Sequence, residues 1–414
     1  MTDTPPDAVA SDPRALGWMV GAPPPADRVL AMTDANVHRF PRLRWTFCNM
    51  RQLNPTVGVS RGAGAAFPLA RDIDPAIDAI RFTPLGGDRE MTWAESLLAN
   101  YTDGVVVLRN GVIVHERYAG ALTETGQHAA MSITKSLMGL LAESFIVEGV
   151  LDDRTTVVEL VPELAGSAFA DATLRQVLDM TTGLRYSETY TDPAAEIWDY
   201  MKATSPLPRP ADDHGPRTSF EYLRTVRKQG EHGQAFAYKT INTDTLGWIL
   251  ARTSGRTTAE LLSDRIWSRI GAEQDAYMTI DSVGTPFAGG GLNTGLRDLA
   301  RVGQLVLDGG VAGDVQVLPR AAIDNLFRGA DPAHFAKAGY DLLPGWSYRG
   351  MWWNTHNAHG AIMARGVHGQ SIYVDPTARM VIARYGTHPV ASSVGNDPVT
   401  LPAFHAVAEY LAGR

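Results

Sequence analysis

The spacing of apolar residues predicts β-rich segments near both ends of the chain and helices between them. Residues 104–118, GVVVLRNGVIVHERY, contain two β-rich runs around Asn110-Gly111, a dipeptide typical of two-residue hairpin turns. Residues 369–386, GQSIYVDPTARMVIARYG, contain two further strand-like runs around a turn that includes proline. We therefore expect one antiparallel sheet that is built from both ends of the chain.

A helix is predicted directly after the first hairpin. It opens near Met131–Ser132 and runs to about Gly149. Its apolar positions recur at three- and four-residue spacing, as expected for a helix with a buried face, and are Leu137, Leu140, Leu141, Phe145 and Val150. This helix would place Ser132 at its start, where backbone N–H groups have no partner within the helix.

The middle of the chain, residues 150–285, is predicted to be mainly helical with long loops. Gly183 and Gly255 stand where C-caps of two of these helices are expected. Residues 287–310 join a glycine-rich turn to another helix, and residues 401–414 have the pattern of a final amphipathic helix. The helices thus lie mostly between the two strand-rich regions.

These patterns predict two domains. A chain of 414 residues exceeds the size at which one hydrophobic core stops growing. We expect an α/β domain made of residues 1–149 and 287–414, with a mainly helical domain, 150–286, inserted in it. The active site is expected in the cleft between them. Residues 1–30 are rich in proline and are predicted to form an extended arm that wraps the body.

Composition and charge narrow the class of protein. The net charge is −8, and the sequence has no stretch rich in basic residues. This composition argues against nucleic acid or an anionic membrane as a partner. Cys48 is the only cysteine, so an internal disulfide is excluded and a reducing compartment is favoured. We see no secretory signal or transmembrane run, and expect a cytoplasmic protein that acts on a small molecule. A homodimer remains open.

The strongest candidate chemistry is the pair Ser132 and Lys135. Only five of the 37 basic residues are lysines, and a lysine differs from an arginine in being able to lose its proton. Residues three apart share one helix face, so the two side chains could exchange a proton. Neutral Lys135 near pH 7 requires a pKa about three units below 10.4, on the order of 4 kcal/mol, which burial and nearby positive charge can supply. The alternative is that Ser132 is only an N-cap and Lys135 a solvated side chain.

The segment MSITKSLMGLL resembles the nucleophile helix of serine β-lactamases, penicillin-binding proteins and their esterase relatives. Two blocks follow in family order: ATLRQVLDMTTGLRYSE and GQAFAYKTINTDTLGWILARTSG. The resemblance implies a class C β-lactamase-like (transpeptidase-like) α/β fold, an antiparallel sheet flanked by helices with a helical insertion. It also implies that Tyr238, in Tyr238-Lys239-Thr240, is a proton shuttle whose pKa a neighbouring cation lowers. The family pattern Tyr-x-Asn would place an asparagine at position 240, but in this sequence Asn242 stands two positions later. The family's Lys-Thr-Gly box is also absent, so β-lactamase activity is doubtful.

Within this superfamily, blocks from about residue 95 to 385 are most similar to the 6-aminohexanoate-dimer hydrolases, among them VPELAGSAF, YTDPAAE and GVHGQSIYVDP. That resemblance implies that the backbone N–H groups of Ser132 and Val367 form an oxyanion hole. It further implies substrate-binding positions at Tyr190, Glu188, Trp353, His368 and Gly289. Two departures concern recognition of the substrate's amino group: Met201 replaces an acid, and Gly289 replaces an asparagine.

We therefore expect a serine hydrolase that cleaves amide or ester bonds through an acyl-enzyme, without a metal or organic cofactor. Linear dimers and short oligomers of 6-aminohexanoate are the expected substrates. A carboxylesterase for short acyl groups is an alternative, favoured by Met201, and a non-catalytic penicillin-binding-like module is another.

Three other signals are interpreted as structural. Ser60, in GVSRG, lacks the strand before it and the helix after it that a nucleophile elbow needs. The histidines His356, His359, His368 and His388 lack the supporting helix expected of a metal site. The segment GGGLNTG has no phosphate-binding lysine and is interpreted as close packing beside the active site.

Overall fold

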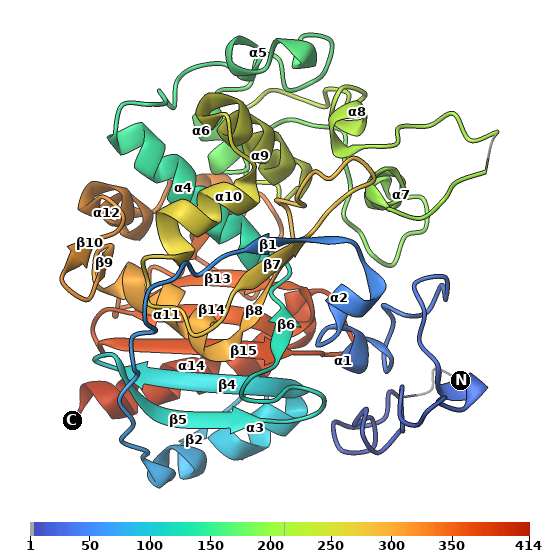
Figure 1. The fold of residues 1–414 in the computed structure, drawn as a ribbon. Helices are drawn as coiled ribbons and strands as arrows, with labels where there is room; N and C mark the ends of the chain where they lie inside the picture. The colour runs from blue at the N-terminus through green and yellow to red at the C-terminus, as the bar shows by residue number, and fades with distance from the viewer. Residues whose placement is uncertain (1–3, 211) are drawn as a thin grey trace.

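The computed structural model describes residues 4–210 and 212–414, and its main feature is a seven-stranded antiparallel sheet (Figure 1). The strand order is β11-β12-β13-β14-β15-β4-β5. The strands are β4 (Thr102–Arg109), β5 (Val112–Tyr118), β11 (Ser347–Arg349), β12 (Trp352–Asn354), β13 (Ile362–Gly366), β14 (Gln370–Asp375) and β15 (Met380–Gly386). Both predicted hairpins are present, and β15 pairs with β4, so the sheet does join the two ends of the chain.

A second sheet supports the start of the predicted nucleophile helix. Its order is β1-β7-β8-β6, with β1 (Thr56–Val59), β6 (Gln127–Ala129), β7 (Ala276–Thr279) and β8 (Leu292–Gly295). Two small ribbons pair β2 (Arg81–Phe82) with β3 (Met91–Thr92) and β9 (Val311–Ala312) with β10 (Val315–Gln316). Strand β7 lies in the segment 150–286, but its two partners lie outside that segment: β1 precedes it and β8 follows it in the sequence. The division into two domains stays a prediction.

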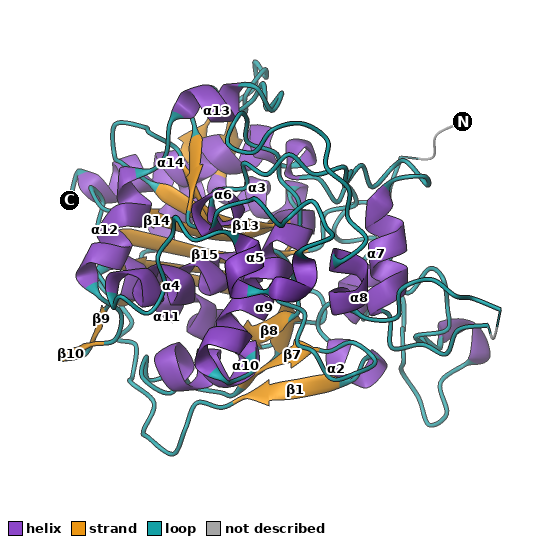
Figure 2. Ribbon diagram, turned by 90° about the horizontal axis from the view of Figure 1, so that it is seen from above, coloured by secondary structure: helices purple, strands orange, loops and turns teal. Residues whose placement is uncertain are grey.

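Helices cover both faces of the large sheet (Figure 2). Helix α11 (Leu296–Leu307) packs closely on one face, because a Cβ at Gly303 would lie 2.5 Å from Val381 and 2.8 Å from Ile372. Helix α14 (Asp397–Ala412) places Phe404 5.7 Å from the ring of Tyr373, the next residue along β14. Neighbouring residues of a strand point to opposite faces, so α11 and α14 sandwich the sheet.

Helix α4 (Ile133–Val147) runs through the centre of the molecule and is buried from Ile133 to Phe145. The other helices are α1 (Leu43–Thr46), α2 (Met50–Leu53), α3 (Trp93–Ala99), α5 (Val157–Leu160), α6 (Leu174–Leu178), α7 (Glu196–Thr204), α8 (Ser219–Leu223), α9 (Ile241–Ser254), α10 (Thr258–Leu262), α12 (Arg320–Arg328) and α13 (Pro332–Ala336). Short 3-10 or π turns are η1 (Ala26–Arg28), η2 (Pro75–Ala79), η3 (Pro162–Leu164), η4 (Ser263–Trp267), η5 (Val367–Gly369) and η6 (Ser393–Gly395). None of the helices in the described ranges is long and apolar enough to cross a membrane.

The two predicted glycine caps have different outcomes. Gly255 ends α9 with φ 69°, the left-handed conformation expected of a C-cap. The prediction for Gly183 is wrong, because α6 already ends at Leu178. A Cβ at position 183 would lie 2.4 Å from the carbonyl oxygen of Gly230, so glycine is needed there for close approach of two backbone segments.

The described part of the N-terminal arm lies against the body through polar contacts and does not form a strand. Arg44 donates to the hydroxyl of Ser11 at 2.8 Å, and the hydroxyl of Tyr101 donates to the carbonyl of Pro6 at 3.0 Å. The arm contains turns and the short η1 rather than one extended run. It contacts the same region as β4, which begins just after Tyr101.

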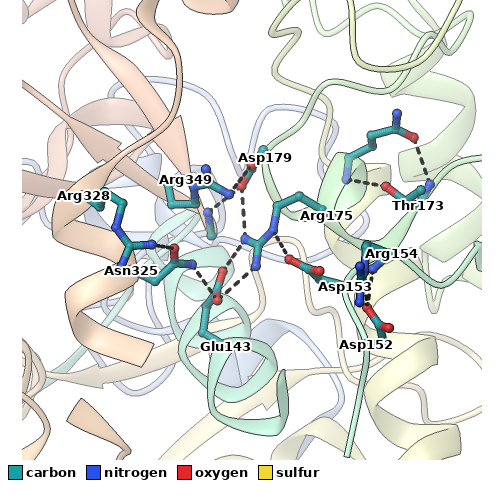
Figure 3. A network of polar contacts seen from close by, with 12 residues as sticks. Glu143, Asp152, Asp153, Arg154, Thr173, Arg175, Asp179, Asn325, Arg328 and Arg349 are labelled. Atoms are coloured by element: carbon teal, nitrogen blue, oxygen red, sulfur yellow. Dashed lines mark hydrogen bonds and ion pairs between the residues drawn. The ribbon is translucent and has the colours of Figure 1, made fainter. Parts of the chain in front are cut away.

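A buried ion network holds α4 against its neighbours (Figure 3). Glu143 of α4 accepts hydrogen bonds from Arg175 of α6 at 2.5 and 3.2 Å and from Asn325 of α12 at 2.9 Å. Asp179, at the end of α6, lies 3.5 Å from Arg175 and 3.0 Å from Arg349 of β11. Four elements distant in sequence therefore meet around two carboxylates that are largely removed from water.

Replacing Glu143 should destabilise the protein strongly. Glu143→Ala leaves the mostly buried side chain of Arg175, which is 19% exposed, without its closest carboxylate, and removing one partner of a buried pair costs about 3–5 kcal/mol. Urea unfolding would measure the free energy of unfolding. Arg154→Ala, which removes an 87% exposed side chain from the pair with Asp152, is the matched control and should change it by less than about 1 kcal/mol. Equal effects of the two substitutions would contradict this account.

Candidate active site

Ser132 stands where strand β6 turns into helix α4. Met131 has φ 48°, a conformation that residues other than glycine rarely adopt, and it turns the chain sharply into the helix. Ser132 is the N-cap residue, but its side chain makes no capping hydrogen bond. Ser132 instead lines a cavity of about 610 Å³, so the alternative that it is only a helix cap does not describe its environment.

Lys135 lies one turn further along α4 and is buried. Its Nζ donates to Ser132 Oγ at 2.9 Å and also to the carbonyl oxygen of Gly289. Burial lowers the pKa of Lys135 to about 8, although the nearby carboxyl groups of Glu188 and Asp244 act in the opposite direction. The predicted decrease therefore has a physical cause, since an ammonium without water around it is disfavoured.

Tyr238 reaches the same point from the segment before α9. Its ring stacks on Trp353 with centroids 5.5 Å apart, and Lys135 Nζ lies 5.3 Å from the ring centroid. Burial raises the pKa of Tyr238, and a hydrogen bond with Ser132 only partly opposes this increase. The expectation of a lowered pKa is therefore wrong. The cation expected to lower it is itself buried, and desolvation of the phenol is the larger effect.

The backbone around Val367 approaches the start of α4. Gly366 ends β13, and a Cβ there would lie only 3.1 Å from the backbone nitrogen of Ser132 and 2.9 Å from the carbonyl oxygen of Ala130. Val367 follows directly in η5 and lines the same cavity as Ser132. Glycine at 366 thus allows the end of β13 to pass beside the helix N-terminus, where partial positive charge is concentrated.

The cavity in front of Ser132 has a volume of about 610 Å³. The residues predicted from the sequence that line it are Ser132, Glu188, Tyr190, Tyr238, Trp353 and Val367. Sequence reasoning missed Tyr340, Arg365, Asp397 and the loop 389–394, which also line it. Arg365 could have been noticed as a charge inside the apolar strand run AIMARGV, since buried charges are rare without a partner. It pairs with Asp397, and its guanidinium lies 5.0 Å from the ring of Trp353.

Two residues predicted to bind substrate, His368 and Gly289, do not line the cavity. The His368 ring lies 5.4 Å from that of Phe47, and its Nδ1 lies 2.7 Å from the carbonyl oxygen of His388, outside the cavity lining. Burial lowers the pKa of His368 to about 4. Gly289 lies behind Lys135 rather than at the cavity, with its N–H 3.1 Å from Asp244 Oδ1. Neither residue therefore lines the cavity in front of Ser132.

Glu188 and Met201 lie in different environments. Glu188 lines the cavity and accepts a hydrogen bond from the backbone N–H of Thr240, and burial raises the pKa of its carboxyl group. Met201 is exposed on α7, outside the cavity lining.

Comparison with known proteins identifies the family. Residues 94–399 match the family model described as Beta-lactamase. The 6-aminohexanoate-dimer hydrolase of Paenarthrobacter ureafaciens is 35% identical over 350 residues, which cover 84% of this chain and 86% of that protein. A Bacillus anthracis structure assigned as a 6-aminohexanoate-dimer hydrolase matches with TM-score 0.84 and 28% identity, covering 94% of this chain and 99% of that chain. The chain belongs to the beta-lactamase family.

This member of the beta-lactamase family is a serine hydrolase by fold and relationship, so the predictions of family, fold class and enzyme are confirmed. A family VIII carboxylesterase shares the fold, with TM-score 0.56 and 14% identity over 83% of this chain and all of that chain. The fold is thus shared with a protein named as a carboxylesterase. The alternative of a non-catalytic module does not describe this hydrolase.

Restoring asparagine at position 289 should disturb this hydrolase rather than improve it. A Cβ at Gly289 would lie 2.4 Å from Thr240 Cγ2 and 2.8 Å from Asp244 Oδ2, so Gly289→Asn must displace these side chains, which pack next to Lys135. Overpacking of this kind costs about 1–3 kcal/mol. Thermal unfolding should show a lower Tm for Gly289→Asn. Gly166→Asn is the control, because no atom lies within 4 Å of its Cβ position, and an unchanged Tm in both variants would contradict the packing argument.

Proposed function

We propose that this protein hydrolyses amide bonds through an acyl-enzyme on Ser132, and that short linear amides of the 6-aminohexanoate type are its substrates. The observation that carries the proposal is the 2.9 Å contact between Lys135 Nζ and Ser132 Oγ at the edge of a cavity. A serine becomes a useful nucleophile when a base within hydrogen-bonding distance can take its proton. The substrate class is supported by the relative named 6-aminohexanoate-dimer hydrolase.

In the proposed mechanism, neutral Lys135 is the base nearest to Ser132. With a pKa of about 8, roughly one tenth of the enzyme has neutral Lys135 at pH 7. Ser132 Oγ attacks the substrate carbonyl while Lys135 accepts the hydroxyl proton. The backbone N–H groups of Ser132 and Val367 would bind the resulting oxyanion, assisted by the positive end of α4.

Tyr238 is proposed to act as an acid, because its raised pKa keeps it protonated near neutral pH. Its phenol gives a proton to the leaving nitrogen or oxygen as the bond to the carbonyl carbon breaks. Transfer of the proton from the ammonium of Lys135 to the phenolate restores both groups. Water then attacks the ester on Ser132. Lys135 accepts a proton from the water, Tyr238 gives a proton to Ser132 Oγ as the acyl group leaves, and a second transfer from Lys135 to Tyr238 restores both groups.

The cavity offers a positive group for a carboxylate on the substrate. Arg365 lines the wall two residues before Val367, and the contact with Asp397 that holds it involves one of its guanidinium nitrogens. A guanidinium carries five N–H donors and binds carboxylates in fixed geometry, so further donors remain for a ligand. A linear aminohexanoate dimer ends in a carboxylate, whereas a neutral short-chain ester has none. Arg365 therefore favours the amide substrate over the alternative of a general carboxylesterase.

Ser132 should react with a fluorophosphonate probe, and the rate should follow the charge of Lys135. Because neutral Lys135 is the active form, labelling should increase about tenfold per pH unit below pH 8 and level off above it. Lys135→Arg keeps the positive charge but cannot lose it, so its labelling rate should fall by about 10²-fold or more. Mass spectrometry of labelled peptides identifies the modified serine.

The control for this experiment is Lys337→Arg, which changes an exposed lysine on the surface. Its labelling rate and pH profile should equal those of the unmodified enzyme. Labelling at a serine other than Ser132, or a rate that does not depend on pH between 6 and 8, would overturn the assignment of the nucleophile and its base.

Arg365→Met should separate the two substrate classes. Loss of a charged hydrogen bond is worth about 1.5–3 kcal/mol, so KM for the aminohexanoate dimer should rise about tenfold or more. KM for p-nitrophenyl butyrate, which has no carboxylate, should change much less in the same variant. Steady-state kinetics with both substrates measure the ratio, and a distorted site would affect both equally. If Arg365→Lys fails to recover part of the dimer activity, the charge is not the cause.

A further inference from the structure

A group of metal-ligating side chains lies outside the cavity, between helix α14 and the loop that joins β12 to β13. His359 belongs to this loop, and His405 and Glu409 belong to α14. One ligand atom from each of the three lies within 4.8 Å of the others. His359 Nε2 is 2.8 Å from Glu409 Oε1, and His405 Nε2 is 3.7 Å from the same oxygen.

The buried residue of the group, His359, is held in place from behind. Its Nδ1 lies 2.9 Å from Oδ2 of Asp375, which is buried at the end of β14 and also accepts a hydrogen bond from Tyr373 at 3.3 Å. With Nδ1 engaged by a carboxylate, Nε2 faces α14. Histidines that bind metals usually donate their second ring N–H to such a carboxylate, which fixes the tautomer and the ring direction.

The helix supplies the other two ligands with suitable spacing. His405 and Glu409 are four residues apart on α14, so they lie on one face of the helix. The rings of His359 and His405 have centroids 5.5 Å apart at 68°, which leaves their nitrogens free to converge on one point. His405 and Glu409 are exposed and can adjust by side-chain rotation, whereas His359 cannot. The sequence spacing of His356 and His359 lacked a supporting helix, and α14 provides it from 46 residues further along the chain.

We propose that His359, His405 and Glu409 bind one zinc ion, with Asp375 as the residue that orients His359. Two imidazoles and one carboxylate are ligands that zinc prefers, and a water molecule would complete a tetrahedral site. In the structure, His359 Nε2 contacts Glu409 directly, and a zinc ion would lie between these two groups. A bound ion would fasten α14 to the loop before β13.

The site is separate from the candidate active site. His359 precedes β13, and Val367 follows it, so the length of a five-residue strand, roughly 16 Å, lies between the two. Zinc binding is therefore expected to change stability and not to take part in the hydrolytic step. Metal binding and hydrolysis can be measured independently, so failure of one proposal leaves the other intact.

The test is titration of the full chain with zinc chloride after treatment with EDTA and removal of the chelator. Isothermal titration calorimetry should show one zinc ion per chain, and thermal unfolding should show a higher Tm with zinc, because a ligand that binds only the folded state stabilises it. His405→Ala and Glu409→Gln change exposed side chains, and each should lower the affinity by at least about tenfold and abolish the Tm increase. Reaction with p-nitrophenyl butyrate should be unchanged in both variants, which shows that they are folded.

His214→Ala, which removes another exposed histidine, is the control for zinc held by surface histidines in general. It should bind zinc as the unmodified chain does. No binding by the unmodified chain, or equal binding by His405→Ala and Glu409→Gln, would overturn the proposal. In the first case the cluster is an ion-pair network only, and in the second the zinc is bound elsewhere.

Discussion

Removal of the Lys135 side chain from water is the constraint on which the candidate site depends. An exposed lysine has a pKa of about 10.4, so it would remain charged at neutral pH and could not accept a proton from Ser132. In this protein, the side chain is enclosed by the helix that carries it, by the carbonyl of Gly289 and by the ring of Tyr238. The same burial raises the pKa of Tyr238, so in the proposed mechanism one environment gives the two groups opposite proton-transfer roles.

The scaffold around α4 maintains this burial. Glu143 and Arg175 hold the helix from one side, while Gly139 allows the backbone of Gly350 to approach so closely that a Cβ would lie 2.0 Å from its carbonyl oxygen. Gly366 likewise allows the end of β13 to approach the backbone at the start of α4. Because these contacts involve backbone and buried ions, α4 has little freedom to shift relative to β13. A rigid frame of this kind favours fixed distances between the reacting groups.

Sequence reasoning predicted the elements and the chemistry that depend on local pattern. The hairpin at Asn110, the start of α4 and the Ser132–Lys135 spacing all follow from short-range rules. Predictions that depend on the surroundings were less accurate. The direction of the Tyr238 pKa and the place of Gly289 beneath Lys135 require knowledge of which side chains exclude water. Arg365 was missed because its carboxylate partner comes from α14, far along the chain.

The order of strands in the large sheet has a consequence for how the enzyme is made. Strand β15 pairs with β4, so Met380 lies opposite Arg109, more than 250 residues earlier. Contacts between such distant segments form slowly, because a long loop must close before they can be made. During synthesis, Ser132 leaves the ribosome long before Val367. The backbone at Gly366 and Val367 can therefore take its place beside the start of α4 only after β13 has been synthesised.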